Sequence, residues 1–182
     1  IAVCFKGDLF GEWVDSNTIM STYNTYTCYF HGGLQLRAAV LNTVNACPQH
    51  TFIFLTKNPA GLIPWGQFPD NCIVGATANN LKMLINAVAM LGQTKARHKW
   101  ISFEPLVEWL PPMWGDYIGA FAQLLKDNHI SWLTIGGYSG GYGKVDIQGV
   151  RELVQIADKA GIKVWLKNNL RSLYPGMEVV PF

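Results

Sequence analysis

The hydrophobic positions of this chain fall into short runs of strand length, separated by stretches in which apolar residues recur at helical spacing. Each run is almost continuously apolar, whereas a strand with one face in water alternates apolar and polar residues. Such runs, alternating with helical segments, predict βα units and a parallel sheet with both faces covered. There are six runs: Ala2–Phe5, Thr51–Leu55, Cys72–Ala76, Lys99–Phe103, Trp132–Ile135 and Lys163–Leu166.

Three one-sided apolar stripes predict helices that pack against this sheet. Their apolar positions fall within residues 81–91, 114–125 and 150–157. Gly161 directly after the last stripe is typical of a helix C-terminus, and Asp15–Asn17 predicts a helix cap before Thr18–Met20. The polar and aromatic segment Ser21–Gly33 has weak periodicity, which leaves a helix extension, an insertion and a lid as open interpretations.

Length and composition favour one folded domain. The chain has 182 residues, of which 49% are hydrophobic and 14% charged, so we predict a single folded domain over residues 1–182. The net charge of +2 is too small to indicate nucleic acid or acidic membranes by itself. No apolar run approaches the roughly 20 residues of a membrane-spanning helix, and Ile1–Phe5 is too short for a signal peptide, so we expect no membrane partner.

The cysteines do not predict a metal site. Cys4, Cys28, Cys47 and Cys72 lie far apart, and no pair has the short spacing of metal-binding motifs. Cys4 and Cys72 fall inside apolar runs, where a free buried thiol acts as a small hydrophobic residue. Unpaired thiols fit a reducing compartment, so the predicted localisation is cytoplasmic.

Polar residues and glycines follow the carboxyl ends of the predicted strands. In parallel β/α folds the βα loops open at this edge, and function gathers there. The residues are Asp8, Lys57, Thr77, Glu104, Gly136, Gly137, Lys167 and Asn168. A barrel would gather two acids and two lysines around one cavity, which makes Asp8, Lys57, Glu104 and Lys167 the candidate catalytic residues.

Structural explanations for these residues stay open. Strand ends are also polar simply because they meet water, and Glu104 and Lys57 could form a buried ion pair without a catalytic role. Gly136–Gly137, followed by Ser139–Gly141, predicts close backbone approach and exposed amides that bind a carboxylate or phosphate. Three tryptophans lie in loops near this edge: Trp13, Trp65 and Trp109. They are either core residues or rings on which a base stacks.

Taken together, the strand ends resemble a phage-associated family of unknown function that is found in bacteria, archaea and their viruses. The matching blocks are Lys6–Phe10, Gln49–Pro59, Ile101–Leu106, Trp132–Gly137 with Ser139–Gly140, and Val164–Asn168. The barrel of that family is similar to that of radical S-adenosylmethionine (SAM) enzymes, and a three-cysteine motif precedes these blocks. The motif is absent here, so either this chain is the C-terminal part of a longer barrel or it has lost the cluster.

The resemblance implies the core of a radical-SAM-like iron-sulfur protein with a partial TIM-type α/β barrel of about six strands. A [4Fe-4S] cluster, whose ligands are not in this chain, would cleave SAM, and the resulting radical would attack a substrate at the rim. Asp8 and Glu104 would bind amino or ribose groups of SAM, and Lys57 and Lys167 an anionic substrate or the SAM carboxylate. The implied cofactor-binding residues are Gly136, Gly137, Ser139, Thr77 and Asn168.

Other functions stay open beside this one. The missing cysteines, and Tyr138 where the family has an acid, favour a non-catalytic barrel that binds a ligand or partner through the same rim. A Schiff-base enzyme using Lys57 or Lys167 rests only on lysines at strand ends. The substrate is unknown, and the phage setting makes nucleic acid a candidate. Exposed barrel edges predict self-association or pairing with missing N-terminal strands.

Overall fold

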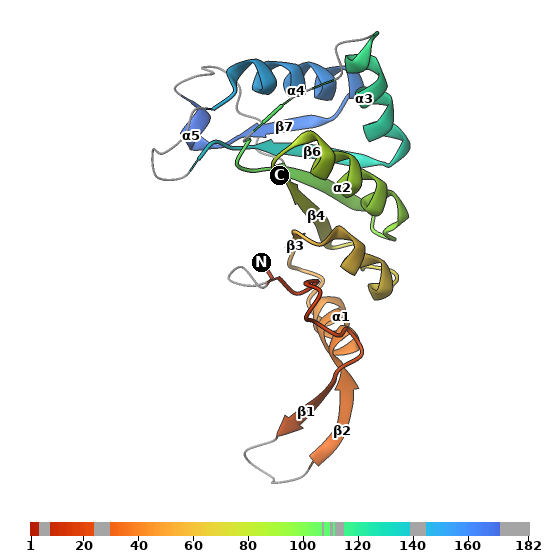
Figure 1. The fold of residues 1–182 in the computed structure, drawn as a ribbon. Coiled ribbons are helices and arrows are strands. Elements are labelled where there is room, and N and C mark those ends of the chain that lie inside the picture. Colours follow the sequence, from red (N-terminus) through yellow and green to blue (C-terminus); the bar gives the residue numbers. More distant parts are fainter. Residues whose placement is uncertain are drawn as a thin grey trace.

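The centre of the fold is an all-parallel sheet of five strands. The structure, a computed structural model, describes residues 1–3, 8–23, 30–106, 108–109, 111, 115–138 and 145–171. The strands lie side by side in chain order (Figure 1): β3 (Phe52–Thr56), β4 (Cys72–Ala78), β5 (His98–Phe103), β6 (Ile130–Ile135) and β7 (Lys163–Leu166). They correspond to five of the six predicted runs, so the predicted α/β class with a parallel sheet is confirmed.

The beginning of the first predicted run pairs with the sheet. Ala2 forms a parallel bridge to Ile53, and the Val3 amide donates to the Ile53 carbonyl oxygen at 3.0 Å. The rest of that run, residues 4–5, lies outside the described residues. Among the described strands β3 and β7 do not pair with each other, so these residues form an open sheet rather than a closed barrel.

Three helices connect the strands: α2 (Leu81–Gln93), α3 (Tyr117–Asp127) and α4 (Ile147–Ala160). They begin after Asn80, Asp116 and Asp146, and each of these side chains accepts a hydrogen bond from the backbone amide three residues further on. Gly161 ends α4 with a φ of 71°, in the left-handed region that favours glycine. The sequence prediction of these three helices and of the glycine stop is confirmed.

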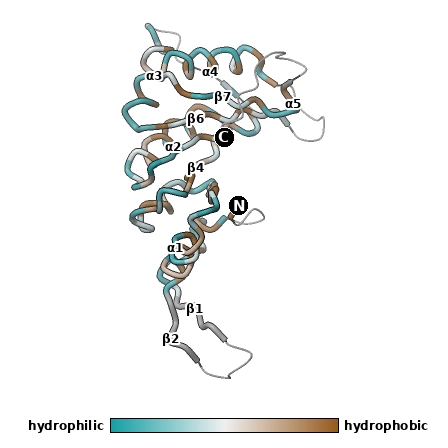
Figure 2. Tube along the Cα trace, turned by 180° about the vertical axis from the view of Figure 1, so that it is seen from behind, coloured by the Kyte–Doolittle hydropathy of each residue, from teal (hydrophilic) through white to brown (hydrophobic). Residues whose placement is uncertain are grey.

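Side chains alternate between two faces of the sheet, and α2, α3 and α4 cover one of them. On that side Val74, Ile101 and Leu133 are fully buried in one core with the apolar sides of the helices. Figure 2 shows hydrophilic and hydrophobic positions alternating along α3 and α4, as expected for helices with one buried side. The opposite face, called the inner face below, carries Ile53, Leu55, Ile73, Gly75, Thr77, Trp100, Ser102, Trp132, Thr134, Lys163 and Trp165.

The middle of the inner face is packed around two tryptophans. Trp100 and Trp132 lie on neighbouring strands with ring centroids 5.2 Å apart, and they are 7% and 6% exposed. A Cβ at Gly75 would lie 2.0 Å from Nε1 of Trp100, so the indole occupies the space of a side chain on β4. Together with Ile73 the two rings form a small apolar layer, called the tryptophan layer below.

The segment before the sheet departs from the sequence prediction. Ile19–Tyr23 is strand β1, which pairs antiparallel with β2 (Phe30–Gln35), so the predicted helix at Thr18–Met20 and its extension are wrong. Asp15 makes a turn instead, because its Oδ1 accepts a hydrogen bond from the Asn17 amide at 2.8 Å. The β-branched and aromatic residues of β1 also favour a strand over a helix.

Three helical elements escaped the sequence prediction: α1 (Leu36–Ala46), the 3-10 helix η1 (Pro59–Trp65) and α5 (Asn168–Arg171). In α1 only Val44 is buried, so its one-sided apolar pattern is weak. The hairpin of β1 and β2 lies beside this helix and away from the parallel sheet (Figure 1). Within the described residues, no helix combines the length and apolarity that crossing a membrane requires.

Candidate functional site

Glu104 and Lys167 form an ion pair at the carboxyl edge of the sheet. Glu104 directly follows β5 and Lys167 directly follows β7, and both continue the inner-face alternation of their strands. Nζ of Lys167 contacts Oε1 of Glu104, and the two side chains are 37% and 21% exposed. Both charged side chains are thus partly exposed to solvent.

Gly136 makes room for this ion pair. It directly follows β6, the strand between β5 and β7, and therefore lies between the two charged residues. A Cβ at Gly136 would lie 2.5 Å from Cγ of Glu104, so any side chain there would displace the carboxylate. Oε2 of Glu104 accepts a hydrogen bond from Oγ of Ser102 at 3.2 Å, which orients the carboxylate from below.

Asp8 ties the first loop of the chain to the end of β3. Its Oδ2 accepts hydrogen bonds from Oγ1 of Thr56 at 2.9 Å and from the Lys57 amide at 2.8 Å. Its Oδ1 accepts from the Phe10 amide at 3.0 Å, and Nδ2 of Asn58 donates to the Phe10 carbonyl oxygen at 2.8 Å. Both carboxylate oxygens therefore accept hydrogen bonds from the chain itself, and these bonds hold the first loop against the end of β3.

The four candidate catalytic residues form two separate groups at the carboxyl edge. Lys57 is exposed after β3, and β4 separates that strand from β5 and Glu104. The alternative that paired Lys57 with Glu104 is wrong, because the partner of Glu104 is Lys167. The end of β3 thus holds Asp8 with the Lys57 backbone, and the ends of β5 and β7 hold the ion pair.

The backbone amides of Gly136 and Gly137 donate hydrogen bonds within the protein. The Gly136 amide donates to the Phe103 carbonyl oxygen at 3.0 Å, and the Gly137 amide donates to Oδ1 of Asn169 at 3.2 Å. Nδ2 of Asn169 in turn donates to the Gly137 carbonyl oxygen at 2.8 Å. Both glycines are buried, so the amides of these two residues are not the exposed ones expected from the sequence, and Ser139–Gly141 lie outside the described residues.

The other residues of the predicted cofactor-binding set differ in their surroundings. Thr77 is partly exposed on the inner face, and Asn168 is exposed at the start of α5. Ser139 lies outside the described residues. Sequence reasoning missed Ser102 and Asn169, although Ser102 precedes Glu104 by two positions and so shares its face, a signal that could have identified it.

The three tryptophans predicted to lie in loops differ in burial. Trp13 is 81% exposed, whereas Trp65 and Trp109 are buried in the core. Nε1 of Trp109 donates to Oε2 of Glu152 at 2.6 Å, so even its polar atom is used within the fold. Of these three rings only Trp13 is available for stacking, and the stacking interpretation of Trp65 and Trp109 is wrong.

The described residues do not form a site for an iron-sulfur cluster. Cys47 and Cys72 are free, and burial raises the pKa of the Cys72 thiol to about 11, which disfavours the thiolate that a metal needs. No three His, Cys, Asp or Glu side chains of the described segments are grouped so as to hold a metal ion. Cys4 and Cys28 lie outside those segments.

A family model matches almost the whole chain. The family is described as a protein of unknown function (DUF5131), and its model matches residues 1–170. The chain therefore belongs to this family. No curated protein and no solved structure matches the chain.

Proposed function

We propose that this DUF5131 chain binds SAM at the carboxyl edge of its parallel sheet, as the core of a radical-SAM-like protein. The observation that carries the proposal is the partly accessible pair of Glu104 and Lys167. The amino-acid part of SAM has an ammonium and a carboxylate, which are complementary to these two charges. The carboxyl edge is also where parallel β/α folds bind their ligands. The resemblance of the strand-end blocks to a radical-SAM-like family supports SAM over other amino-acid ligands.

Each residue of the site has a separate task in this proposal. Glu104 accepts hydrogen bonds from the ligand ammonium while Ser102 holds its second oxygen in place. Lys167 turns from Glu104 toward the ligand carboxylate, so one internal ion pair is replaced by two pairs with the ligand. Thr77 of β4 is opposite Ser102 of β5 and is partly exposed, and it supplies a hydroxyl for a ribose oxygen.

The chain itself contributes binding and orientation. When SAM is bound to a reduced iron-sulfur cluster it is a source of organic radicals. The described residues offer no ligands for such a cluster. What this part of the chain does is therefore to hold the amino-acid group of SAM at a defined place on the sheet.

Calorimetric titration with SAM tests the proposal. We expect Glu104→Gln and Lys167→Gln each to weaken binding by about tenfold or more, because each removes a charge-assisted contact with the ligand. Lys126→Gln is the matched control, since Lys126 is exposed on α3 and follows no strand. Binding that is absent in the native protein, or equal in all variants, would contradict the proposal.

A second candidate function, binding of a ligand or partner without catalysis, is favoured by the hydrogen bonds that polar groups of the carboxyl edge already make within the protein. Both oxygens of Asp8 and both glycine amides are occupied within the protein, as expected for a non-catalytic barrel that binds a ligand or partner. One experiment distinguishes the two candidate functions. It is anaerobic iron and sulfide analysis with electron paramagnetic resonance, on protein expressed from the complete reading frame. About four irons per chain with a signal altered by SAM supports the first function. Absence of iron in a protein that still binds its ligand supports the second.

A further inference from the structure

Asn169 joins the segment after β7 to the end of β6 by two hydrogen bonds. Its Oδ1 accepts from the Gly137 amide at 3.2 Å, and its Nδ2 donates to the Gly137 carbonyl oxygen at 2.8 Å. Two bonds to one residue fix both distance and orientation, whereas a single bond allows rotation about it. Because Gly137 is buried, loss of this side chain would deprive two buried backbone groups of these partners.

The backbone of Lys167 is held by the same end of β6. Its amide donates to the Ile135 carbonyl oxygen at 2.9 Å, and its carbonyl oxygen accepts from the amide of Leu170, which is buried in the core. Asn169 lies between Lys167 and Leu170 in the chain. Its bonds to Gly137 therefore continue the connection to β6 that the Lys167 amide begins at Ile135.

The first of the two adjacent glycines, Gly136, is connected to the segment that carries Glu104. The Gly136 amide donates to the Phe103 carbonyl oxygen at 3.0 Å, and its carbonyl oxygen accepts from the Leu106 amide at 2.9 Å. Phe103 and Leu106 lie on either side of Glu104 in the chain. The glycine pair is therefore hydrogen-bonded to the segment of Glu104 on one side and to Asn169 on the other.

The two charged side chains of the ion pair are supported in different ways. Glu104 is oriented directly, because the Ser102 hydroxyl donates to its Oε2. Lys167 has a flexible four-carbon stem, so the place of its ammonium depends on where its backbone is held. Asn169 acts on that backbone, two positions further along the chain, and so provides for Lys167 what Ser102 provides for Glu104.

We propose that Asn169 is a positioning residue of the candidate site. By holding the segment after β7 against the end of β6, it keeps the Lys167 ammonium beside Glu104. The pair is thereby held at the spacing at which its two charges meet the ammonium and the carboxylate of an amino-acid ligand. The part of this proposal that concerns the ligand rests on the proposed binding of SAM, whereas the part that concerns the ion pair does not.

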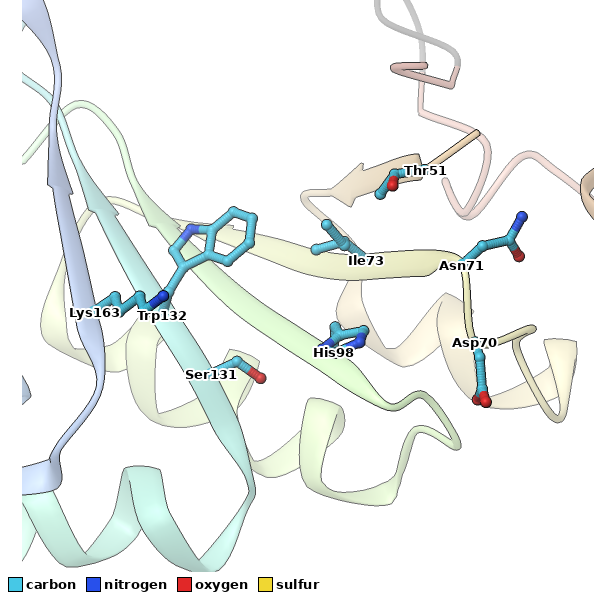
Figure 3. A pocket seen from close by; sticks show the side chains of 8 residues that line it. All are labelled: Thr51, Asp70, Asn71, Ile73, His98, Ser131, Trp132 and Lys163. Carbon is cyan, nitrogen blue, oxygen red and sulfur yellow. The ribbon is translucent and has the colours of Figure 1, made fainter. Parts of the chain in front are cut away.

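Asn71 offers a matched control at the opposite end of the sheet. It directly precedes β4 and lies beside a cavity of about 380 Å³ at the amino ends of the strands, which Lys163 also lines (Figure 3). Its Nδ2 donates to backbone carbonyl oxygens within residues 44–50 at 3.1 to 3.3 Å. Asn71→Ala therefore removes bonds from a side chain to the backbone, as Asn169→Ala does, but at a distance from the carboxyl edge.

A double-mutant cycle of Glu104→Gln and Lys167→Gln, measured by urea unfolding, tests the part that concerns the ion pair. We expect Asn169→Ala to reduce the coupling between the two charges to less than about half of its native value. Asn71→Ala should lower the stability but leave the coupling unchanged, so a merely structural effect is recognised. Equal coupling in Asn169→Ala and in the native protein, or no coupling in the native protein, would overturn the proposal.

Calorimetric titration with SAM tests the part that concerns the ligand. We expect Asn169→Ala to weaken binding about fivefold and Asn71→Ala to change it by less than about twofold. Binding to Asn169→Ala that is as tight as to the native protein would overturn this part. Absence of binding to the native protein would overturn it together with the proposed function, while the double-mutant cycle still decides whether Asn169 positions Lys167.

Discussion

Lys163 is the first residue of β7, and Lys167, four positions later, directly follows the strand and continues its inner-face alternation. Lys167 contacts Glu104 at the carboxyl edge, whereas Lys163 lines the open cavity at the amino end and has no carboxylate partner among the described residues. The two lysines share residue type and face, and they flank the same strand. The difference teaches that the neighbouring strands, and not the residue itself, decide whether a charge is balanced within the fold or is available to a ligand.

The largest expected effect comes from breaking the tryptophan layer that separates the two ends. Gly75→Ala places a Cβ 2.0 Å from Nε1 of Trp100, so we expect a loss of about 3 kcal/mol in the free energy of unfolding. Gly161→Ala is the control, since its φ of 71° strains the backbone but no atom lies near the new Cβ, and its cost is about 1 kcal/mol. Urea unfolding measures both. Equal costs would show that Trp100 moves aside freely.

A second prediction concerns the amino end on the helix-covered face. Burial raises the pKa of the Cys72 thiol from 9.0 to about 11, so the native state keeps its proton to higher pH than the unfolded chain does. This contribution to stability is complete below pH 9.0 and is lost as the pH rises to about 11. Relative to Cys72→Ala, the native protein should lose about 2 kcal/mol over that window in urea unfolding. Parallel pH profiles for the two proteins would contradict the burial of the thiol.

At the carboxyl edge we expect Lys167→Gln to lower the free energy of unfolding by about 1–2 kcal/mol. The value lies between those of exposed and buried pairs because both partners are partly exposed. A double-mutant cycle with Glu104→Gln isolates the coupling between the two charges. A coupling near zero would mean that the pair is formed but contributes nothing to stability.

The smallest effect is expected at the other end of the same strand. Lys163→Gln should change the free energy of unfolding by less than about 0.5 kcal/mol, since the lysine is exposed and no described carboxylate contacts it. The same urea titration measures it beside Lys167→Gln. A loss as large as that of Lys167→Gln would remove the contrast between the two ends.

The parallel sheet was predictable because its strands are marked by local pattern. Runs such as Thr51–Leu55 and Cys72–Ala76 have apolar residues on both faces, which is typical of a covered parallel strand. The hairpin of β1 and β2 was not predictable in the same way, because Asp15 is equally suited to a helix cap and to a turn. Helix α1 escaped because only Val44 of it is buried.

The candidate site was predictable as a set of positions but not as a set of contacts. Glu104 and Lys167 follow apolar runs, so both could be placed at the carboxyl edge from sequence. Their pairing could not, because it depends on β6 having Gly136 between them, where a Cβ would lie 2.5 Å from Glu104. The role of Asp8 likewise depends on Thr56, which is 48 positions away in the chain.

The sequence by itself determined the parallel α/β class, the five strands, the three covering helices and the edge at which the charged residues gather. These follow from local hydrophobic periodicity, capping residues and glycines, which act over a few positions of the chain. Only the tertiary structure decided which charges pair, that the glycine amides are occupied, and that a cavity with an unpartnered lysine opens at the other end. Those features arise from residues of different strands that the folded sheet brings within a few ångströms.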